Sequence, residues 1–219
     1  MKPTRPDNRQ TGLTMIELLC VIAALAILIG LLLPKAGGNR QKATTTACLS
    51  HLKQVALGQI IWANEHSSGG PTTNLPAGDA GFGKHLSSDG IASYYRALSN
   101  ELVSPVILTC PSDNRRPAAD FQSLTTNHLS YFLNMDVRSV AETSTALNGD
   151  RHITFTPAPS GQTMTLTPNL SVQWTKKLGH RNLGNVALVD GSVQKTTSRD
   201  LTLILLPPSN ILPQRLLFP

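Results

Sequence analysis

The sequence has 219 residues and a mass of 23.5 kDa, enough for one ordinary domain with an appendage or for two very small domains. Charged residues make up only 15% of the chain, and its 16 Gly and 15 Pro residues form no repeat, which excludes collagen-like and highly charged disordered classes. The formal net charge is +6, but the basic residues are scattered from Lys2 to Arg215, so a nucleic-acid partner is not expected.

A long apolar run extends from Leu13 to Leu33 and ends at Pro34. Its 21 residues measure about 31 Å as a helix, enough to cross the core of a bilayer. A short basic leader precedes the run, and no small-residue cleavage site of the secretory type follows it. We therefore expect a leader over residues 1–12 and a membrane-spanning helix over residues 13–34.

Glu17 is the one acidic residue inside this run. A carboxylate in a spanning helix costs a few kcal/mol, so such a residue is a candidate functional group. Two interpretations are open. If the chain is cut between Gly12 and Leu13, Glu17 of one subunit can neutralise the new α-amino group of its neighbour. Alternatively, Glu17 lies close enough to the helix end for its carboxylate to reach the headgroups.

The segment from Gly12 to Leu28 resembles the N-terminal signature of type IV prepilins and pseudopilins, in which Gly is followed by Phe-Thr-Leu-Ile-Glu-Leu and a long apolar helix. The resemblance implies that a prepilin peptidase cleaves after Gly12 and methylates Leu13, which replaces the usual Phe. It also implies a helix kink at Pro34, a cytoplasmic leader, and a single-pass protein of the bacterial inner membrane whose head lies outside the cytoplasm.

Beyond the apolar run, residues 41–66 carry apolar positions at intervals of three and four, which predicts an amphipathic helix. This helix continues the membrane helix over residues 35–66, with a break near Pro34. Residues 67–89 are rich in Gly, Ser, Pro and Asn and predict a loop, and residues 91–102 predict a short second helix.

The rest of the chain contains short strand-like runs. Asp190-Gly191 joins two of them and favours a two-residue hairpin turn. A helix is expected over residues 200–206. This order predicts an α+β fold, with a long N-terminal helix followed by a globular head over residues 67–219 that holds a small antiparallel sheet and a C-terminal hairpin. The predicted strands are residues 106–109, 129–133, 152–156, 164–167, 171–175, 185–189 and 192–195.

Three cysteines cannot all pair with one another. Cys48 and Cys110 follow the apolar run, whereas Cys20 lies inside it, so an oxidising exterior can join the first two. We favour this disulfide over the alternative of two reduced, buried cysteines.

No catalytic or cofactor-binding constellation is present in the sequence. The six histidines form no His-x-x-x-His pair, and there is no Gly-x-Ser-x-Gly motif. Residues 78–85 match a phosphate-binding loop except that His85 replaces the final Ser or Thr, and we interpret this as coincidence in a glycine-rich loop. We expect the protein not to be an enzyme and to need no cofactor.

A second resemblance involves His180, which precedes Asp190-Gly191 by nine residues. This spacing resembles the H-X9-DG motif of a bacterial subgroup of prepilin-like proteins. The segments 48–54, 110–113, 130–134, 149–151 and 215–219 also resemble that subgroup. Some major pseudopilins bind calcium through C-terminal loops, which makes Asp113, Asp150 and Asp190 the calcium candidates. The alternative, which we favour, is that Asp190-Gly191 forms a turn and His180 hydrogen-bonds within the head.

Together these features predict a pseudopilin-like subunit of a type II secretion pseudopilus or a type IV pilus-like filament. Its expected partners are prepilin peptidase, other pseudopilin subunits and the assembly machinery of the inner membrane. The alternative is a permanently anchored envelope protein whose head binds a surface ligand. An exposed aromatic cluster would favour that alternative, and Tyr94, Tyr95 and Trp174 are its candidates.

Overall fold

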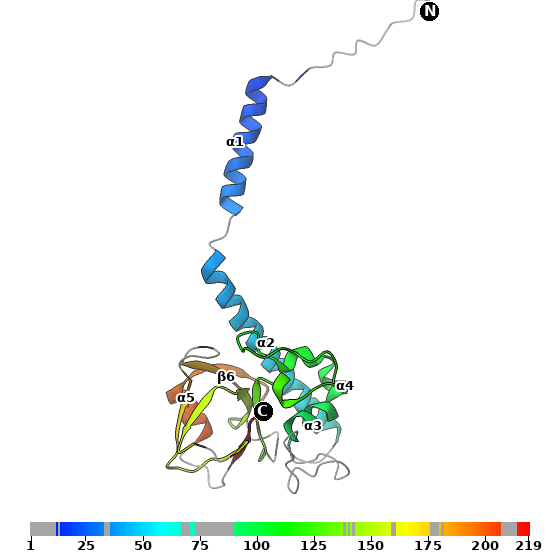
Figure 1. Cartoon of the computed structure of the whole chain (residues 1–219), viewed down its shortest axis with the longest axis vertical. Helices are drawn as coiled ribbons and strands as arrows, with labels where there is room; N and C mark the ends of the chain where they lie inside the picture. The colour runs from blue at the N-terminus through cyan, green and yellow to red at the C-terminus, as the bar shows by residue number, and fades with distance from the viewer. Residues whose placement is uncertain are drawn as a thin grey trace, which may run out of the picture. The chain divides into compact units, whose positions relative to one another are not determined.

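The computed structural model describes residues 12, 14–32, 36–66, 71–72, 90–137, 139, 141, 143–158, 161–175, 180, 182–206 and 214–219 (Figure 1). Leu13, Pro34 and the segment 78–85 lie outside these residues, as does the leader before Gly12. The chain divides into two compact units, residues 1–41 and 42–219, and we refer to the second unit as the head.

Helix α1 (Met15–Leu32) is the main element of the first unit among the described residues. Its residues from Met15 to Gly30 are all exposed within the chain. Among the described residues, no helix has both the length and the apolarity needed to cross a membrane, so the span expected over residues 13–34 is not confirmed.

Helix α2 (Ala36–Glu65) contributes one apolar face to the head. Cys48, Leu52 and Val55 are fully buried on that face, whereas Leu57 and Ile61 are exposed. Three further α-helices complete the head: α3 (Gly90–Ala97), α4 (Ser99–Leu102) and α5 (Ser198–Leu205). Two 3-10 helices, η1 (Pro105–Leu108) and η2 (Thr126–His128), lie between α4 and the first strand.

The sheet of the head has six antiparallel strands in the order β4-β8-β1-β2-β6-β7. A separate antiparallel pair is formed by β3 and β5. The α+β class predicted from the sequence is therefore confirmed. The strands are β1 (Tyr131–Asn134), β2 (Ala146–Asp150), β3 (Ile153–Thr156), β4 (Thr163–Thr165), β5 (Ser171–Trp174), β6 (Leu183–Leu188), β7 (Val193–Thr197) and β8 (Arg215–Leu217).

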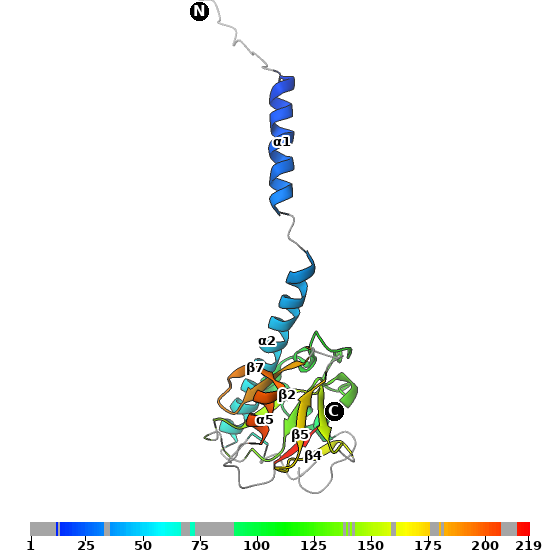
Figure 2. The ribbon, with the colours of Figure 1, turned by 90° about the vertical axis from the view of Figure 1, so that its left-hand side faces the viewer.

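Both faces of the six-stranded sheet are covered. Along β1, Tyr131 and Leu133 pack with α2, α3 and α4, whereas Phe132 packs with α5 and the β3/β5 pair. The same alternation holds in β6, where Val186 and Ala187 point to opposite clusters. Figure 1 shows α5 and the α3/α4 pair on opposite sides of the head, and Figure 2 shows α5 beside β5.

Two details of the sequence prediction are wrong. Residues 106–109 do not form a strand, because Pro105 fixes the backbone at the start of η1 and the Ser104 hydroxyl accepts a hydrogen bond from the Val106 N–H. The β6–β7 connection is not a two-residue turn. The Gly191 N–H donates to the Leu188 carbonyl and Gly191 has φ +79°, which gives a three-residue loop with glycine in the left-handed region.

Gly149 in β2 provides a test of the packing. A Cβ at this position would lie 2.7 Å from Phe132 Cε1 and 2.8 Å from the backbone oxygen of Asn185. We expect Gly149→Ala to lower the free energy of unfolding by about 1–3 kcal/mol, because the carbonyl of β6 cannot move aside. Gly161→Ala is the control, since nothing lies within 4 Å of its Cβ. Equal urea midpoints for the two variants would contradict the close approach of β2 and β6.

Candidate functional site

A disulfide joins Cys48 of α2 to Cys110, which follows η1, with their Cα atoms 4.9 Å apart. This is the pairing favoured by the sequence. Both residues are buried, at 0% and 3% exposure. Cys20 on α1 is free and exposed. The disulfide therefore links α2 covalently to the segment that precedes the sheet.

His180 lies beside this disulfide, with its Nε2 3.5 Å from Cys110 Sγ. The same nitrogen accepts a hydrogen bond from the Asn185 side-chain amide at 3.0 Å and lies 3.6 Å from Asp150 Oδ2. Burial lowers the pKa of His180, and the positive charge of Lys195 acts in the same direction. The imidazole is therefore neutral at pH 7, which agrees with its role as acceptor. His180 hydrogen-bonds within the head, as we favoured from the sequence.

Asp150 ends strand β2 and is buried. Its Oδ2 accepts hydrogen bonds from the backbone N–H of Asn185 at 2.7 Å and from the side-chain amide of Asn185 at 3.0 Å. Burial raises the pKa of Asp150 to about 7, although the hydrogen bond from the Asn185 backbone opposes this. The Asp150 carboxyl is thus divided between its protonated and charged forms near neutral pH.

Asp113 lies near Asp150, but its pKa is shifted in the opposite direction. Its carboxylate receives two hydrogen bonds from Arg151, at 2.8 and 3.0 Å, and lies 3.4 Å from His152 Nε2. Burial disfavours the charged form, but the nearby His152 and the hydrogen bonds from Arg151 outweigh it and hold the pKa of Asp113 well below its usual range. Asp113 is therefore a charged carboxylate that is already paired.

The residues that meet around His180 and Asp113 come from segments singled out in the sequence or are neighbours of those segments, and we call them the motif cluster. The structure brings them together from α2, the segment after η1, the end of β2, and the region of β6. Together they form a chain of polar and sulfur contacts. The motif cluster consists of Cys48, Cys110, Asp113, Asp150, Arg151, His152, His180 and Asn185.

Asp190 and Gly191 are not part of the motif cluster. They form the β6–β7 turn, in which Asp190 Oδ1 accepts a hydrogen bond from the Ser192 N–H at 2.8 Å. A Cβ on Gly191 would lie 3.2 Å from Leu57 Cδ2 of α2, so the turn packs directly on that helix. The His and Asp-Gly parts of the motif thus have different surroundings.

The three calcium candidates do not converge. Asp113 pairs with Arg151, Asp150 with Asn185, and Asp190 with its own turn. Within the described ranges, no group of three ligand-forming side chains includes any of these aspartates.

Neither Asn185 nor His152 was predicted as a site residue. Asn185 carried a usable signal, because it is an amide inside the apolar run of residues 183–189. A fully buried amide in such a strand needs hydrogen-bond partners. The side-chain amide of Asn185 is fully buried and donates to both Asp150 and His180. His152 carried no such signal, since it immediately follows the charged residues at the end of β2.

The three aromatic residues whose exposure would favour a ligand-binding head lie in the core. Tyr94, Tyr95 and Trp174 are buried, at 1%, 0% and 3% exposure, and they pack in the two hydrophobic clusters. These side chains therefore give no support to the alternative of a surface-binding head. Their burial follows from the two-sided covering of the sheet, which needs large side chains on both faces.

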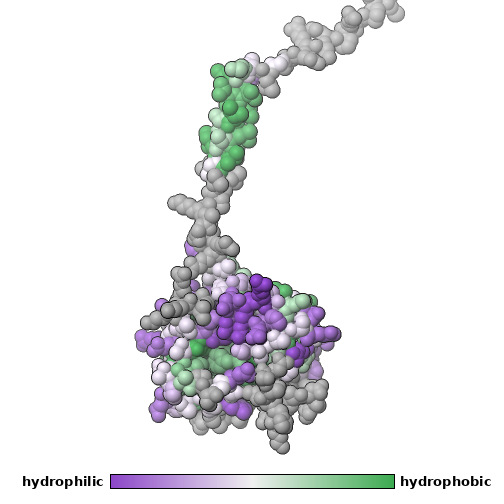
Figure 3. Space-filling model, in the orientation of Figure 1, coloured by the Kyte–Doolittle hydropathy of each residue, from purple (hydrophilic) through white to green (hydrophobic). Residues whose placement is uncertain are grey.

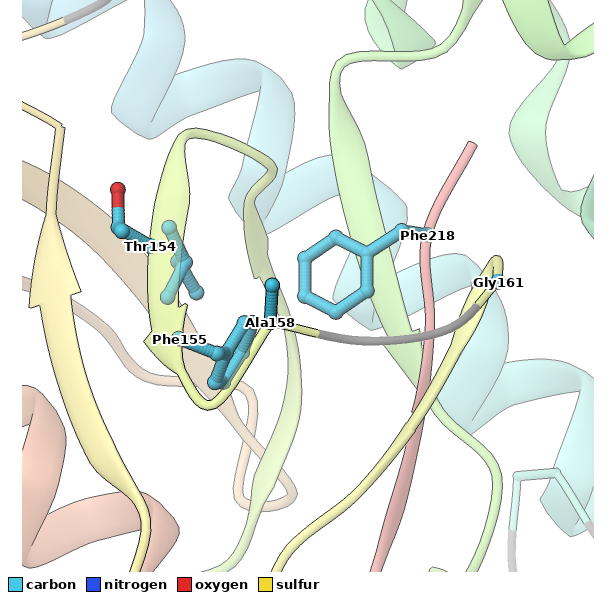
Figure 4. Close-up of a pocket in the computed structure, with 6 residues that line it drawn as sticks. Thr154, Phe155, Ala158, Gly161 and Phe218 are labelled. Atoms are coloured by element: carbon cyan, nitrogen blue, oxygen red, sulfur yellow. The ribbon is translucent and has the colours of Figure 1, made fainter.

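An apolar pocket of about 260 Å³ lies between β3 and the end of the chain (Figure 4). The rings of Phe155 and Phe218 form its walls, and Ala158 lies between them in Figure 4. None of the described residues that line this pocket has a titratable side chain. The lining residues are Ile153, Thr154, Phe155, Ala158, Gly161 and Phe218.

At the N-terminus, Thr14 and Glu17 form a reciprocal pair. The Thr14 N–H and hydroxyl donate to Glu17 Oε2 at 2.8 and 2.9 Å, and the Glu17 N–H donates to Thr14 Oγ1 at 3.4 Å. This is the capping-box arrangement, which satisfies free backbone donors at the start of a helix. Glu17 therefore also caps the start of α1, a role that was not predicted from the sequence.

Apart from Glu17 in its first turn, α1 carries exposed apolar side chains along its length, and the face seen in Figure 3 is largely apolar. Met15 and Ile16 are 81% and 70% exposed, and Ile27 and Ile29 further along remain 65% and 59% exposed. A helix without a polar face requires apolar surroundings from outside its own chain. Gly12, at the predicted cleavage position, is exposed.

The family model of the prokaryotic N-terminal methylation motif matches residues 7–33. The N-terminus is pilin-like. The match supports a type IV pilin-like or pseudopilin-like protein that a prepilin peptidase processes and that is anchored in a membrane. The chain matches no curated protein and no solved structure.

The Asp113–Arg151 pair gives a test of the motif cluster. Asp113 is 1% exposed and Arg151 is 21% exposed, so Asp113→Asn leaves a largely buried guanidinium without its counter-charge. We expect a loss of about 2–3 kcal/mol in unfolding free energy at pH 7. The more solvent-accessible pair between Arg215, at 44% exposure, and Asp136, at 16%, is the control, and Asp136→Asn is expected to cost less than about 1 kcal/mol.

The difference in unfolding free energy between wild type and Asp113→Asn should depend on pH. Because the pKa of Asp113 is lower in the folded chain than in the unfolded chain, its stabilising effect is complete above about pH 4 and is lost as the pH falls further. The difference between wild type and Asp113→Asn should therefore shrink below about pH 4 in denaturant titrations. A difference that stays constant down to pH 2 would count against a charged Asp113.

Proposed function

We propose that this protein is a pseudopilin-like subunit that assembles into a type II secretion pseudopilus or a type IV pilus-like filament. The observation that carries the proposal is the methylation motif over residues 7–33, with Gly12 exposed before an apolar helix. Prepilin peptidase cleaves after Gly12 and methylates the new N-terminus at Leu13. The chain itself has a structural role, without catalysis and without a cofactor.

The exposed surface of α1 supports this role. In the precursor, the apolar segment of residues 13–34 anchors the subunit in the inner membrane with its head outside the cytoplasm. During assembly the same surface packs against other subunits in the filament core, and burial of apolar area at about 25 cal/mol per Å² supplies most of the association energy. The exposed apolar side chains of α1 suit both surroundings.

Glu17 has two possible partners in this scheme. In the single chain it accepts hydrogen bonds from Thr14. After cleavage, the amine of Leu13 on a neighbouring subunit offers a positive charge, and pairing with it sets the axial register of the filament. Assembly then exchanges the local cap for an intersubunit ion pair, which the low dielectric of the filament core strengthens.

We propose further that the head is of the kind found in the H-X9-DG subgroup of prepilin-like proteins. His180, Asp150 and Cys110 belong to different segments that resemble this subgroup, and they meet in the motif cluster. We propose that these segments serve to hold the head in one arrangement, so that its surface contacts other subunits or secretion substrates in a fixed way.

The first test is the N-terminal mass of the protein isolated from native membranes, with and without prepilin peptidase. We expect a methylated Leu13 terminus in the presence of the peptidase and the uncleaved leader in its absence. The uncleaved leader in both preparations would overturn the proposal. The permanently anchored envelope protein would then be the better description.

The second test separates the two roles of Glu17. Glu17→Gln keeps a hydrogen-bonding side chain for the cap but removes the charge, whereas Thr14→Ala removes the cap hydroxyl and keeps the charge. We expect Glu17→Gln and Glu17→Ala to reduce filament incorporation at least tenfold, with cleavage intact. Thr14→Ala should incorporate much better than either. Incorporation is measured as the ratio of sheared filament to membrane-bound subunit.

If Glu17→Gln assembles like the wild type, the intersubunit ion pair plays no part and the carboxylate serves only the local cap. If all three variants are lost from the membrane before cleavage, the defect lies in insertion, which immunoblotting of membrane fractions detects.

A further inference from the structure

Three metal-ligating atoms of the motif cluster lie together in the head. Cys48 Sγ, Cys110 Sγ and His180 Nε2 are all within 4.8 Å of one another. They come from α2, from the segment after η1, and from the segment before β6, so no local sequence spacing reveals them. Two sulfurs and an imidazole are a ligand set that Zn²⁺ prefers.

The separation of these atoms fits a tetrahedral zinc ion. With Zn–S bonds of about 2.3 Å and Zn–N bonds of about 2.1 Å, a sulfur and a nitrogen ligand lie about 3.5 Å apart, and two sulfur ligands lie about 3.8 Å apart. The Cys110 Sγ to His180 Nε2 distance is 3.5 Å. The sulfurs of Cys48 and Cys110 can move apart to the separation of two zinc ligands only after reduction, because a disulfide holds them at about 2.05 Å.

We propose that Cys48, Cys110 and His180 form a Zn²⁺-binding site when the disulfide is reduced. A two-electron reductant cleaves the S–S bond to give two thiols; a dithiol becomes a disulfide in this step, and a phosphine takes up oxygen from water to become a phosphine oxide. Zn²⁺ then displaces the two thiol protons into solvent and binds both thiolates and the neutral imidazole. A water molecule completes the four ligands.

The surroundings of His180 show what must change when the ion binds. In the oxidised head the lone pair of Nε2 accepts a hydrogen bond from the Asn185 amide. The metal takes this lone pair, and the Asn185 amide keeps its other hydrogen bond, to Asp150 Oδ2. The oxidised and metal-bound states therefore use the same side chains and exclude each other. This inference concerns the head alone and is independent of filament assembly.

The test uses the full-length Cys20→Ser protein in detergent, in which Cys48 and Cys110 are the only cysteines left. After reduction with a phosphine, Co²⁺ is added as a spectroscopic substitute for Zn²⁺. We expect one Co²⁺ per chain, a near-ultraviolet sulfur-to-cobalt charge-transfer band, visible bands of tetrahedral cobalt, and loss of all these bands on addition of Zn²⁺. The same protein with its disulfide intact should give no charge-transfer band.

Variants identify the third ligand. His180→Ala should weaken Co²⁺ binding at least tenfold, whereas His128→Ala, a histidine of η2 that makes a local cap with Thr125, should leave it unchanged. His180→Cys should restore binding with a stronger charge-transfer band, because a third thiolate replaces the imidazole. If His180→Ala does not fold, His180→Gln takes its place in the comparison.

Three results would overturn the proposal. The first is a reduced, folded protein without a charge-transfer band. The second is equal Co²⁺ affinity in the His180→Ala, or substituted His180→Gln, and His128→Ala proteins. The third is loss of the near-ultraviolet circular dichroism of the head on reduction, with no recovery when Zn²⁺ is added, since the site requires the folded arrangement.

Discussion

The contact of α2 with one face of the six-stranded sheet is the interaction on which the head depends. At its centre, the Asn148 amide of β2 donates to Gln59 Oε1 at 2.7 Å, and the Gln59 amide donates to the Tyr94 hydroxyl at 3.1 Å. Tyr94 in turn donates to the carbonyl of Pro71. Because these polar groups are buried among apolar side chains, they fix one register of α2 on the sheet. The disulfide at Cys48 then adds a covalent constraint to the same helix.

Much of the fold could be predicted from the sequence. The apolar run, the amphipathic pattern before His66 and the Asp190-Gly191 turn predicted two helices and a hairpin, because each has a regular period or a specific turn residue. Strand β2 was missed because Ala146–Asp150 carries Asn, Gly and Asp, which are depleted in strands. It forms a central strand only because the polar side chains find partners on α2 and β6, which is tertiary information.

The residues of the candidate site also fall into those that the sequence could predict and those that it could not. Gly12 and Glu17 belong to a contiguous motif, so their roles could be inferred from the residues alone. The motif cluster joins side chains separated by up to 137 positions, and the sequence indicated only that Cys48 and Cys110 favour pairing. The resemblance of several segments to one subgroup gave no sign that His180 lies against the disulfide, because that contact is set by the register of β6 beside β2.

The packing of the β6–β7 turn limits how the protein can be engineered. Hairpin tips are customary places for epitope tags and fluorescent labels, because most of them lie free in solvent. Here Gly191 is buried against Leu57 and Ile60 of α2. An insertion at Gly191 would push the turn away from the helix, so a label is better attached to the exposed side chain of Asp190.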